Sequence, residues 1–169
     1  MSNYRIEETS EKIFFVTPAP ASPSDLTEDI KACMIRQALG ILPNSYAPYS
    51  HYNVAAAVLM SSGKIYTGVN IESALLSATI YAERNTIFHA AAQGERRIVS
   101  IAVVGGIDAA DGRPLTEYCT PCGVCRQVMR DYAGPDDMTI ICAKTPDDYR
   151  EWTLGEMLPE SFGPETLEE

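Results

Sequence analysis

The stretch PCGVCRQVM at residues 121–129 places two cysteines, Cys122 and Cys125, three positions apart at the expected start of a helix. Side chains with this spacing can both reach one tetrahedral zinc ion. The first N–H groups of a helix lack intrahelical partners and carry the positive end of its dipole, which favours thiolates there. A redox pair is the alternative, but it would want a thioredoxin-like βαβ context at the N-terminus, which the sequence does not show. The stretch therefore favours a metal site.

The segment YAER at residues 81–84 lies near the start of the preceding predicted helix, which runs from about Thr79 to Gln93. A glutamate beside a metal ion can shuttle protons for an activated water, and Glu83 is the candidate. Taken alone, Glu83 would be better explained as a solvated residue stabilised by the helix dipole. Together, the two segments are similar to the pattern of zinc nucleobase deaminases, in which H-x-E is followed by P-C-x-x-C.

Sequence patterns in the rest of the chain predict strands that alternate with helices. Ser24 is placed to cap a helix that runs to about Leu42. Strands are expected over VAAAVLM and KIYTGVN, which form a hairpin around SSG, and then over IVSIAVVG and MTIICAK. The acidic tail is expected to be irregular apart from one short helical turn. This order predicts helices packed on the faces of a sheet. Residues 24–169 are expected to form one domain, and residues 1–23 an extension on the surface or on a neighbouring subunit.

Four stretches, in this order along the chain, resemble the small zinc-dependent cytidine deaminases: YAPYSHYNVAAAVL, GKIYTGVNIE, AERN and PCGVCRQVM. The tail segment LPESFGP is similar to the C-terminal segment of that family. The resemblance implies a three-layer α/β/α fold and a homotetramer with sites near subunit interfaces. It also implies that zinc activates a water to attack C4 of cytidine, deoxycytidine or a modified cytosine nucleoside, which yields the uridine product and ammonia.

The resemblance assigns Cys122 and Cys125 as ligands of Zn²⁺, the implied cofactor, and Glu83 as the proton shuttle. The family has a cysteine or histidine, its third metal ligand, where this chain has Tyr81. Three outcomes are open: the Tyr81 phenol oxygen binds zinc, Cys119 supplies a third thiolate, or two cysteines alone hold zinc weakly. Direct ligation by Tyr81 keeps three protein ligands and an open position for water. We expect Tyr81 to face the metal position.

For the substrate, the resemblance assigns the ribose hydroxyls to Asn70 and Glu72, and the base to the backbone N–H of Ala82. An amide and a carboxylate two residues apart at a strand end can both accept hydrogen bonds from a diol, which suits the first role. Tyr52 stands where the family usually has a phenylalanine that lines the pocket. Phe162 resembles a family aromatic that reaches the base pocket, either within the chain or across an interface.

The length and charge of the chain limit the kinds of partner that it can bind. The chain has 169 residues, enough for one domain with a buried core, and its net charge is −10. Phosphate backbones are held by an excess of Lys and Arg, so this balance argues against a nucleic-acid partner and fits a small, uncharged ligand better, which the resemblance implies is a pyrimidine nucleoside. No apolar run approaches the ~20 residues of a membrane span, and no signal peptide is evident. We therefore expect no membrane partner and a cytoplasmic location.

Two competing hypotheses remain beside a deaminase. One is a catalytically impaired nucleoside-binding homologue that lacks tightly bound zinc, and the other is a structural zinc protein without a substrate. The structural role is disfavoured because Glu83, Asn70 and Glu72 would then have no reason to occur together. Zinc content measured together with cytidine turnover separates all three hypotheses.

Overall fold

The computed structural model describes residues 4–9, 14–134 and 137–167. In these residues a seven-stranded sheet has the order β1-β2-β4-β3-β5-β6-β7. The strands are β1 (Arg5–Glu8), β2 (Phe14–Thr17), β3 (Tyr52–Met60), β4 (Lys64–Val69), β5 (Ile98–Ile107), β6 (Thr139–Thr145) and β7 (Asp148–Thr153). The helices are α1 (Glu28–Ile41), α2 (Ala82–Ala92), α3 (Gly123–Tyr132) and α4 (Leu154–Met157). Neighbouring strands are antiparallel except β5 and β6, which are parallel and are joined through α3.

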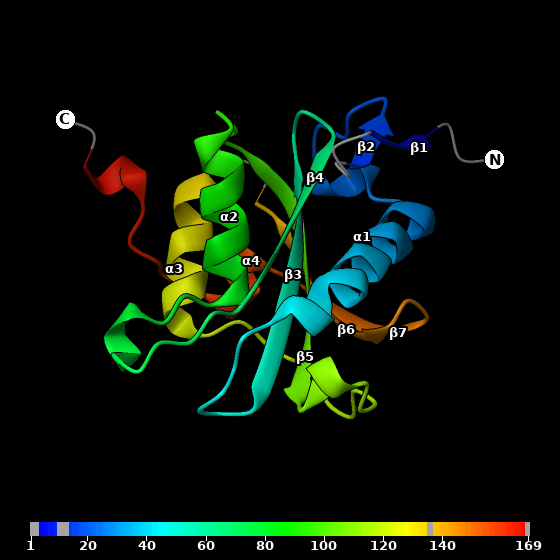
Figure 1. The fold of residues 1–169 in the computed structure, drawn as a ribbon. Helices are drawn as coiled ribbons and strands as arrows, with labels where there is room; N and C mark the ends of the chain where they lie inside the picture. The colour runs from blue at the N-terminus through cyan, green and yellow to red at the C-terminus, as the bar shows by residue number, and fades with distance from the viewer. Residues whose placement is uncertain (1–3, 10–13, 135–136, 168–169) are drawn as a thin grey trace.

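Helices cover both faces of this sheet (Figure 1). One face carries α1, which packs over β3, β4 and β5 with Ile30, Met34 and Ile35 fully buried. The other face carries α2 and α3, which lie side by side. Two clusters of buried residues result, one beneath α1 and one beneath α2 and α3. This is the three-layer α/β/α arrangement that the sequence predicts.

A glycine sets the distance between α2 and the sheet. A Cβ atom at Gly68 on β4 would lie 2.6 Å from Thr86 Oγ1 and 2.9 Å from the Thr86 backbone nitrogen. The Thr86 hydroxyl in turn donates a hydrogen bond of 2.7 Å to the carbonyl of Ala82, the first residue of α2. The first turn of α2, which carries Glu83, is therefore held tightly against the sheet.

The N-terminal segment adds two strands to the same sheet. β2 pairs with the beginning of β4, with Phe14 opposite Ile65 and Phe15 opposite Lys64, and β1 pairs with β2. Of the predicted extension 1–23, residues 1–3 and 10–13 lie outside the described residues. The part that is described packs on its own chain.

The first predicted helix begins later than expected. Ser24 lies in a separate 3-10 turn, which the Asp25 carboxylate closes by accepting hydrogen bonds from two preceding amides. Thr27 caps α1 instead, since its Oγ1 accepts a hydrogen bond from the Ile30 amide. The Ser24 cap predicted from the sequence is therefore wrong, because Asp25 completes a local turn before α1 can start.

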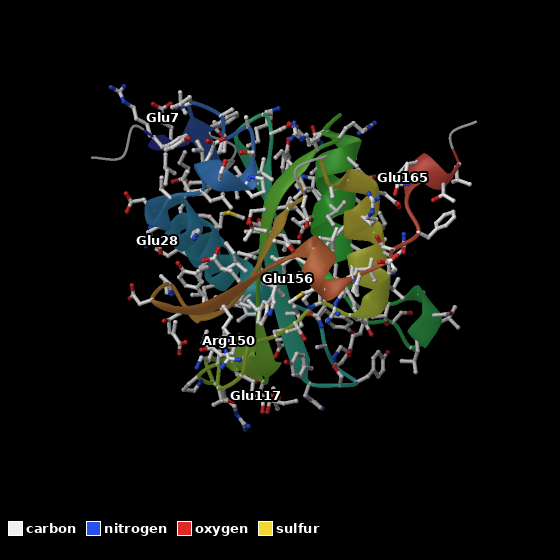
Figure 2. The ribbon with its side chains drawn as sticks, turned by 180° about the vertical axis from the view of Figure 1, so that it is seen from behind. Glu7, Glu28, Glu117, Arg150, Glu156 and Glu165 are labelled. Atoms are coloured by element: carbon white, nitrogen blue, oxygen red, sulfur yellow. The ribbon has the colours of Figure 1, made fainter. Side chains whose placement is uncertain are left out.

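The second predicted helix also begins later, because Ile80 still pairs with Ile71 through two backbone hydrogen bonds before α2 starts at Ala82. The strand β7 was not predicted, and it forms one edge of the sheet. Figure 2 shows Arg150 on β7 and Glu156 on α4, the short turn of helix that follows it. None of the helices in the described residues has both the length and the apolar character that a membrane span requires.

Candidate active site

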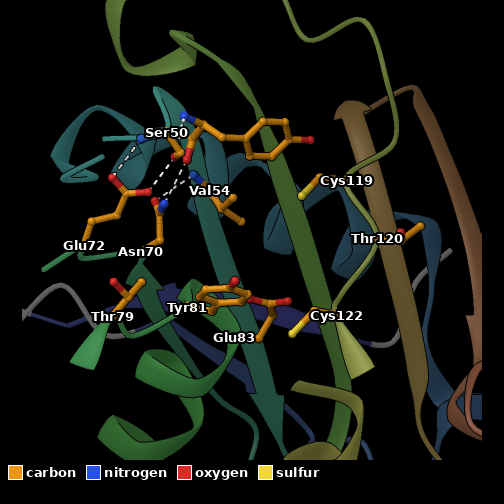
Figure 3. A pocket seen from close by; sticks show the side chains of 11 residues that line it. Ser50, Val54, Asn70, Glu72, Thr79, Tyr81, Glu83, Cys119, Thr120 and Cys122 are labelled. Carbon is orange, nitrogen blue, oxygen red and sulfur yellow. Dashed lines mark hydrogen bonds between the residues drawn. The ribbon is translucent and has the colours of Figure 1, made fainter. Parts of the chain in front are cut away.

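A cavity of about 290 Å³ lies where the N-terminal ends of α2 and α3 meet the start of β3 and the end of β4 (Figure 3). Its volume lies just below the usual range of small-molecule sites, ~300–1,000 Å³. Residues predicted from the sequence line it: Tyr52, Asn70, Glu72, Tyr81, Glu83 and Cys122. It is also lined by residues that received no substrate role, namely Ser50, Val54, Thr79, Cys119 and Thr120.

Glu83 is the buried acid of this cavity. It is the second residue of α2 and only 3% exposed. Burial raises the pKa of its carboxyl group above the ordinary value, and the Cys125 thiol donates a hydrogen bond to it. A buried carboxyl group whose pKa is raised holds a proton more readily than an exposed one, which suits it to proton transfer.

The two cysteines of the first motif meet beside this carboxyl group. Cys122 is the N-cap of α3, and Cys125 lies buried in its first turn. Their Sγ atoms are 3.5 Å apart. Zinc–sulfur bonds of ~2.3 Å at a tetrahedral angle would place two sulfurs ~3.8 Å apart. The two thiols therefore fit two corners of a tetrahedral zinc site with little movement.

In the residues that the structure describes, no third ligand of a usual type, His, Cys, Asp or Glu, completes a zinc site with the two cysteines. Within the described part of the chain, no group of three or more His, Cys, Asp and Glu side chains could hold a metal ion. Tyr81, the N-cap of α2, lines the same cavity as Glu83 and Cys122 (Figure 3), and its predicted place at the metal stays a prediction. The Arg84 guanidinium lies 5.1 Å from the centre of its ring, within the range of cation–π contact.

Cys119 faces a different neighbour. Its thiol accepts a hydrogen bond from the Tyr52 hydroxyl, and burial followed by the nearby Glu83 raises its pKa to about 12. Figure 3 shows Cys119 farther from Glu83 than Cys122 is in that view. The alternative in which Cys119 completes a three-thiolate site would require it to leave Tyr52.

At the opposite end of the cavity, Glu72 is held by the loop before β3. Its carboxylate accepts hydrogen bonds from the amides of Tyr49 and Ser50 and from the Ser50 hydroxyl. Although burial raises the pKa of Glu72, these hydrogen bonds hold it below the ordinary value. Glu72 is thus an ionised acceptor, and Ser50 places a hydroxyl beside it that the sequence did not single out.

Asn70 clamps the start of β3. Its Oδ1 accepts a hydrogen bond of 2.9 Å from the Val54 amide, and its Nδ2 donates one of 2.8 Å to the Tyr52 carbonyl. The side chain is 6% exposed. Its amide therefore positions the strand that carries Tyr52, and its predicted role at the ribose stays a prediction.

This clamp gives a stability prediction. Replacing Asn70 by Ala leaves the Val54 amide and the Tyr52 carbonyl without their partner, and an unsatisfied buried group costs ~1–3 kcal/mol. We expect Asn70→Ala to lower the free energy of unfolding by about 2 kcal/mol in urea titrations. Asn70→Asp keeps an acceptor for Val54 but sets a buried carboxylate oxygen against the Tyr52 carbonyl, so it should lose at least as much. A change below about 0.5 kcal/mol in Asn70→Ala would contradict the clamp.

Two predicted residues lie elsewhere. Ala82 is fully buried between Tyr81 and Glu83 at the first position of α2, where its backbone was expected to meet the base. Phe162 is exposed in the C-terminal segment beside α3, where its carbonyl accepts a hydrogen bond from Gln127. It is not among the residues that line the cavity of its own chain. A role in the base pocket would therefore require a second copy of the chain.

Comparisons with known proteins agree with this geometry. A family model described as the cytidine and deoxycytidylate deaminase zinc-binding region matches residues 28–142. A cytidine deaminase of Halalkalibacterium halodurans is 38% identical over 134 residues, 79% of this chain and 95% of the relative. A probable cytidine deaminase of Dictyostelium discoideum is 33% identical over 83% of this chain and 88% of its own length. The crystal structure of cytidine deaminase from Burkholderia pseudomallei matches with a TM-score of 0.67 at 33% identity, over 77% of this chain and 97% of that chain.

Proposed function

The chain belongs to the cytidine and deoxycytidylate deaminase family, and from this premise we propose that it deaminates a free cytosine nucleoside in the cavity, with Glu83 as proton shuttle. Membership confirms the predicted fold, the predicted hydrolase class and the predicted cofactor, since the family is defined by its zinc-binding region. The site residues and the exact nucleoside belong to the proposal.

One observation carries the proposal. A carboxyl group that is 3% exposed lines the cavity together with the Cys122 thiol, whose Sγ lies 3.5 Å from that of the buried Cys125, while ionised Glu72 occupies the other end. The reacting end can therefore manage protons and hold a metal, and the far end can accept hydrogen bonds from a sugar.

Zinc and the residues of the chain would supply different parts of the reaction. Zinc, when bound by Cys122, Cys125 and a third donor from Tyr81, supplies a water acidic enough to act as a nucleophile at neutral pH. Glu83 would take one proton from the attacking water and pass it to N3 of the ring, and would then take the second proton of the same oxygen and pass it to the departing amine after the C4–O bond has formed. The C4–O bond forms before the C4–N bond breaks, so cytidine and water give uridine and ammonia.

The test combines zinc content with turnover. Protein purified without chelator is assayed for zinc per chain and for the absorbance change from cytidine to uridine. We expect bound zinc and turnover together. Zinc without any nucleoside binding would leave only a structural metal site and would overturn the proposal.

Tyr81 favours a second candidate, a nucleoside-binding homologue impaired in catalysis. Without a third Cys, His, Asp or Glu ligand in the described residues, the site depends on a phenol oxygen to complete it. Nucleoside binding measured by calorimetry, without turnover and without zinc, would support this candidate over the first.

The partners proposed are a pyrimidine nucleoside and further copies of this chain. The net charge of −10 opposes a polynucleotide partner, so single-stranded oligodeoxycytidine should give no turnover in the same assay. Exposed apolar side chains at Leu75, Leu76 and Phe162 support self-association. The homotetramer and the cytoplasmic location stay predictions.

A further inference from the structure

A second cavity, of about 390 Å³, adjoins the catalytic cavity across one residue. Tyr52 lines both cavities, and it is the one residue shared between their described linings. The second cavity is otherwise formed by the end of β5 and by the segment that follows it, including Gly106, Arg113, Thr116 and Glu117. Tyr52 is therefore the partition between the two spaces.

Two glycines at the end of β5 line the second cavity together with Tyr52. Gly105 and Gly106 lie opposite Val54 and Asn53 in the sheet register. A Cβ atom at Gly105 would lie 3.1 Å from Cys119 Sγ and 2.8 Å from the Asn53 carbonyl oxygen. Gly105 thus leaves room for Cys119 to approach the sheet, whereas a Cβ atom at Gly106 would lie 3.2 Å from Leu115 Cδ2.

The backbone of Tyr52 is anchored by two hydrogen bonds. Its backbone amide donates to Ser50 Oγ at 3.0 Å, and its carbonyl accepts from Asn70 Nδ2 at 2.8 Å. At the far end its hydroxyl donates a hydrogen bond to the Cys119 thiol. Burial raises the pKa of Tyr52 to about 12, so the hydroxyl remains a donor at neutral pH. The ring thus extends from an anchored backbone toward Cys119, which lines the catalytic cavity with it.

The two anchors also indicate which part of a substrate meets the ring. The backbone of Tyr52 is bonded to Ser50 and Asn70, which belong to the end of the cavity that holds Glu72. Its hydroxyl is bonded to Cys119, three residues before Cys122 at the reacting end. The ring therefore spans the wall from the sugar end toward the end where the exocyclic amine would leave.

From this geometry, and resting on the proposed function, we infer that Tyr52 determines specificity by confining the enzyme to cytosines whose amine-bearing edge carries no bulky substituent. Without the Tyr52 ring, the two cavities would join into one space whose volume is more than twice that of the catalytic cavity alone. The second cavity then accepts the substituent of an N4-alkylated cytosine nucleoside, whose hydrolysis releases the alkylamine in place of ammonia.

The test compares N4-butylcytidine with cytidine in the zinc-loaded full chain. We expect Tyr52→Ala to raise the ratio of kcat/KM for N4-butylcytidine over cytidine by at least ~10-fold, since even one methylene in an apolar pocket is worth ~10–200-fold. Tyr52→Phe keeps the ring and should change the ratio less than about twofold. An unchanged ratio in a folded Tyr52→Ala protein would overturn the inference.

A second pair of variants separates a joined cavity from general loosening. Thr116 is exposed, lines the second cavity and lies outside the catalytic cavity. In the Tyr52→Ala background, Thr116→Trp should fill the second cavity and return the ratio to the wild-type value, while Thr116→Ser should not. Alone, Thr116→Trp should leave cytidine turnover unchanged. A gain that survives Thr116→Trp would contradict the assigned cavity.

Binding measured by calorimetry tests this inference separately from the proposed deamination. If the wild-type protein does not turn over cytidine, the proposed deamination fails, and the partition is judged by dissociation constants alone. Tighter binding of N4-butylcytidine to Tyr52→Ala than to the wild type would still support the partition. Equal binding to both proteins, or binding of neither nucleoside, would overturn it.

Discussion

Glu83→Gln is expected to lower cytidine turnover by at least ~10²–10⁴-fold while the fold and the zinc content stay as in the wild type. Glutamine is nearly isosteric with glutamate but can neither take a proton from water nor return one to the departing amine. The loss should exceed that range, because one carboxyl group serves both the attack and the departure. Turnover, zinc per chain and thermal unfolding are measured on the same preparation.

The matched control is Glu117→Gln, which removes an exposed carboxylate outside the catalytic cavity. It changes the net charge equally and should leave turnover unchanged. Glu83→Gln protein that deaminates cytidine at a rate near that of the wild type would show that Glu83 is not the shuttle.

Tyr81→Cys is expected to raise the affinity for zinc by at least ~10-fold and to raise deaminase activity with it. The change adds a third thiolate beside Cys122 and Cys125 and so completes the set of three protein ligands that a catalytic zinc site uses. Losing an outer-sphere contact already costs ~10–100-fold in metal affinity, so gaining a direct ligand should have at least that effect. Affinity is measured by competition with a chelator, and turnover is measured side by side.

Tyr81→Phe distinguishes the two roles of the tyrosine. It keeps the ring beneath the Arg84 guanidinium and removes only the oxygen. If the phenol oxygen is a ligand, zinc affinity should fall in Tyr81→Phe; if the ring merely fills the place of a ligand, affinity should not change. Should Tyr81→Cys alter neither zinc nor turnover while the wild type is fully metallated and active, the placement of Tyr81 at the metal would be wrong.

The core of the fold was predictable because its central strands are continuous apolar runs and the helices beside them end near Pro43 and Gly94, which are clear stop signals. The edge strands were not, because β1 and β7 carry charged residues in place of an apolar pattern, and their pairing is visible only in three dimensions. Helix starts were misplaced where a local interaction intervened, as the Asp25 carboxylate does before α1.

Some residues of the candidate site could likewise be predicted from the sequence, and others could not. Glu83 and the cysteines could be predicted because short motifs place them at helix starts, where burial and the dipole act on them directly. Ser50 and the clamp formed by Asn70 could not be predicted, because their partners lie on segments 16 to 22 residues away. Tyr52 was expected at the pocket, but the second cavity beside it is lined by the end of β5 and the segment that follows, which no local pattern links to Tyr52.

The two outermost strands of the sheet, β1 and β7, affect whether copies of this protein can associate by strand pairing. β1, with Arg5, Glu7 and Glu8, closes one border of the sheet, and β7, with Asp148, Arg150 and Glu151, closes the other. Charged side chains on a border strand oppose the backbone-to-backbone pairing that leads to continuous intermolecular sheets and aggregation. Copies that associate are thereby directed away from the borders and toward the apolar loops near the cavity, and concentrated solutions should resist fibril formation.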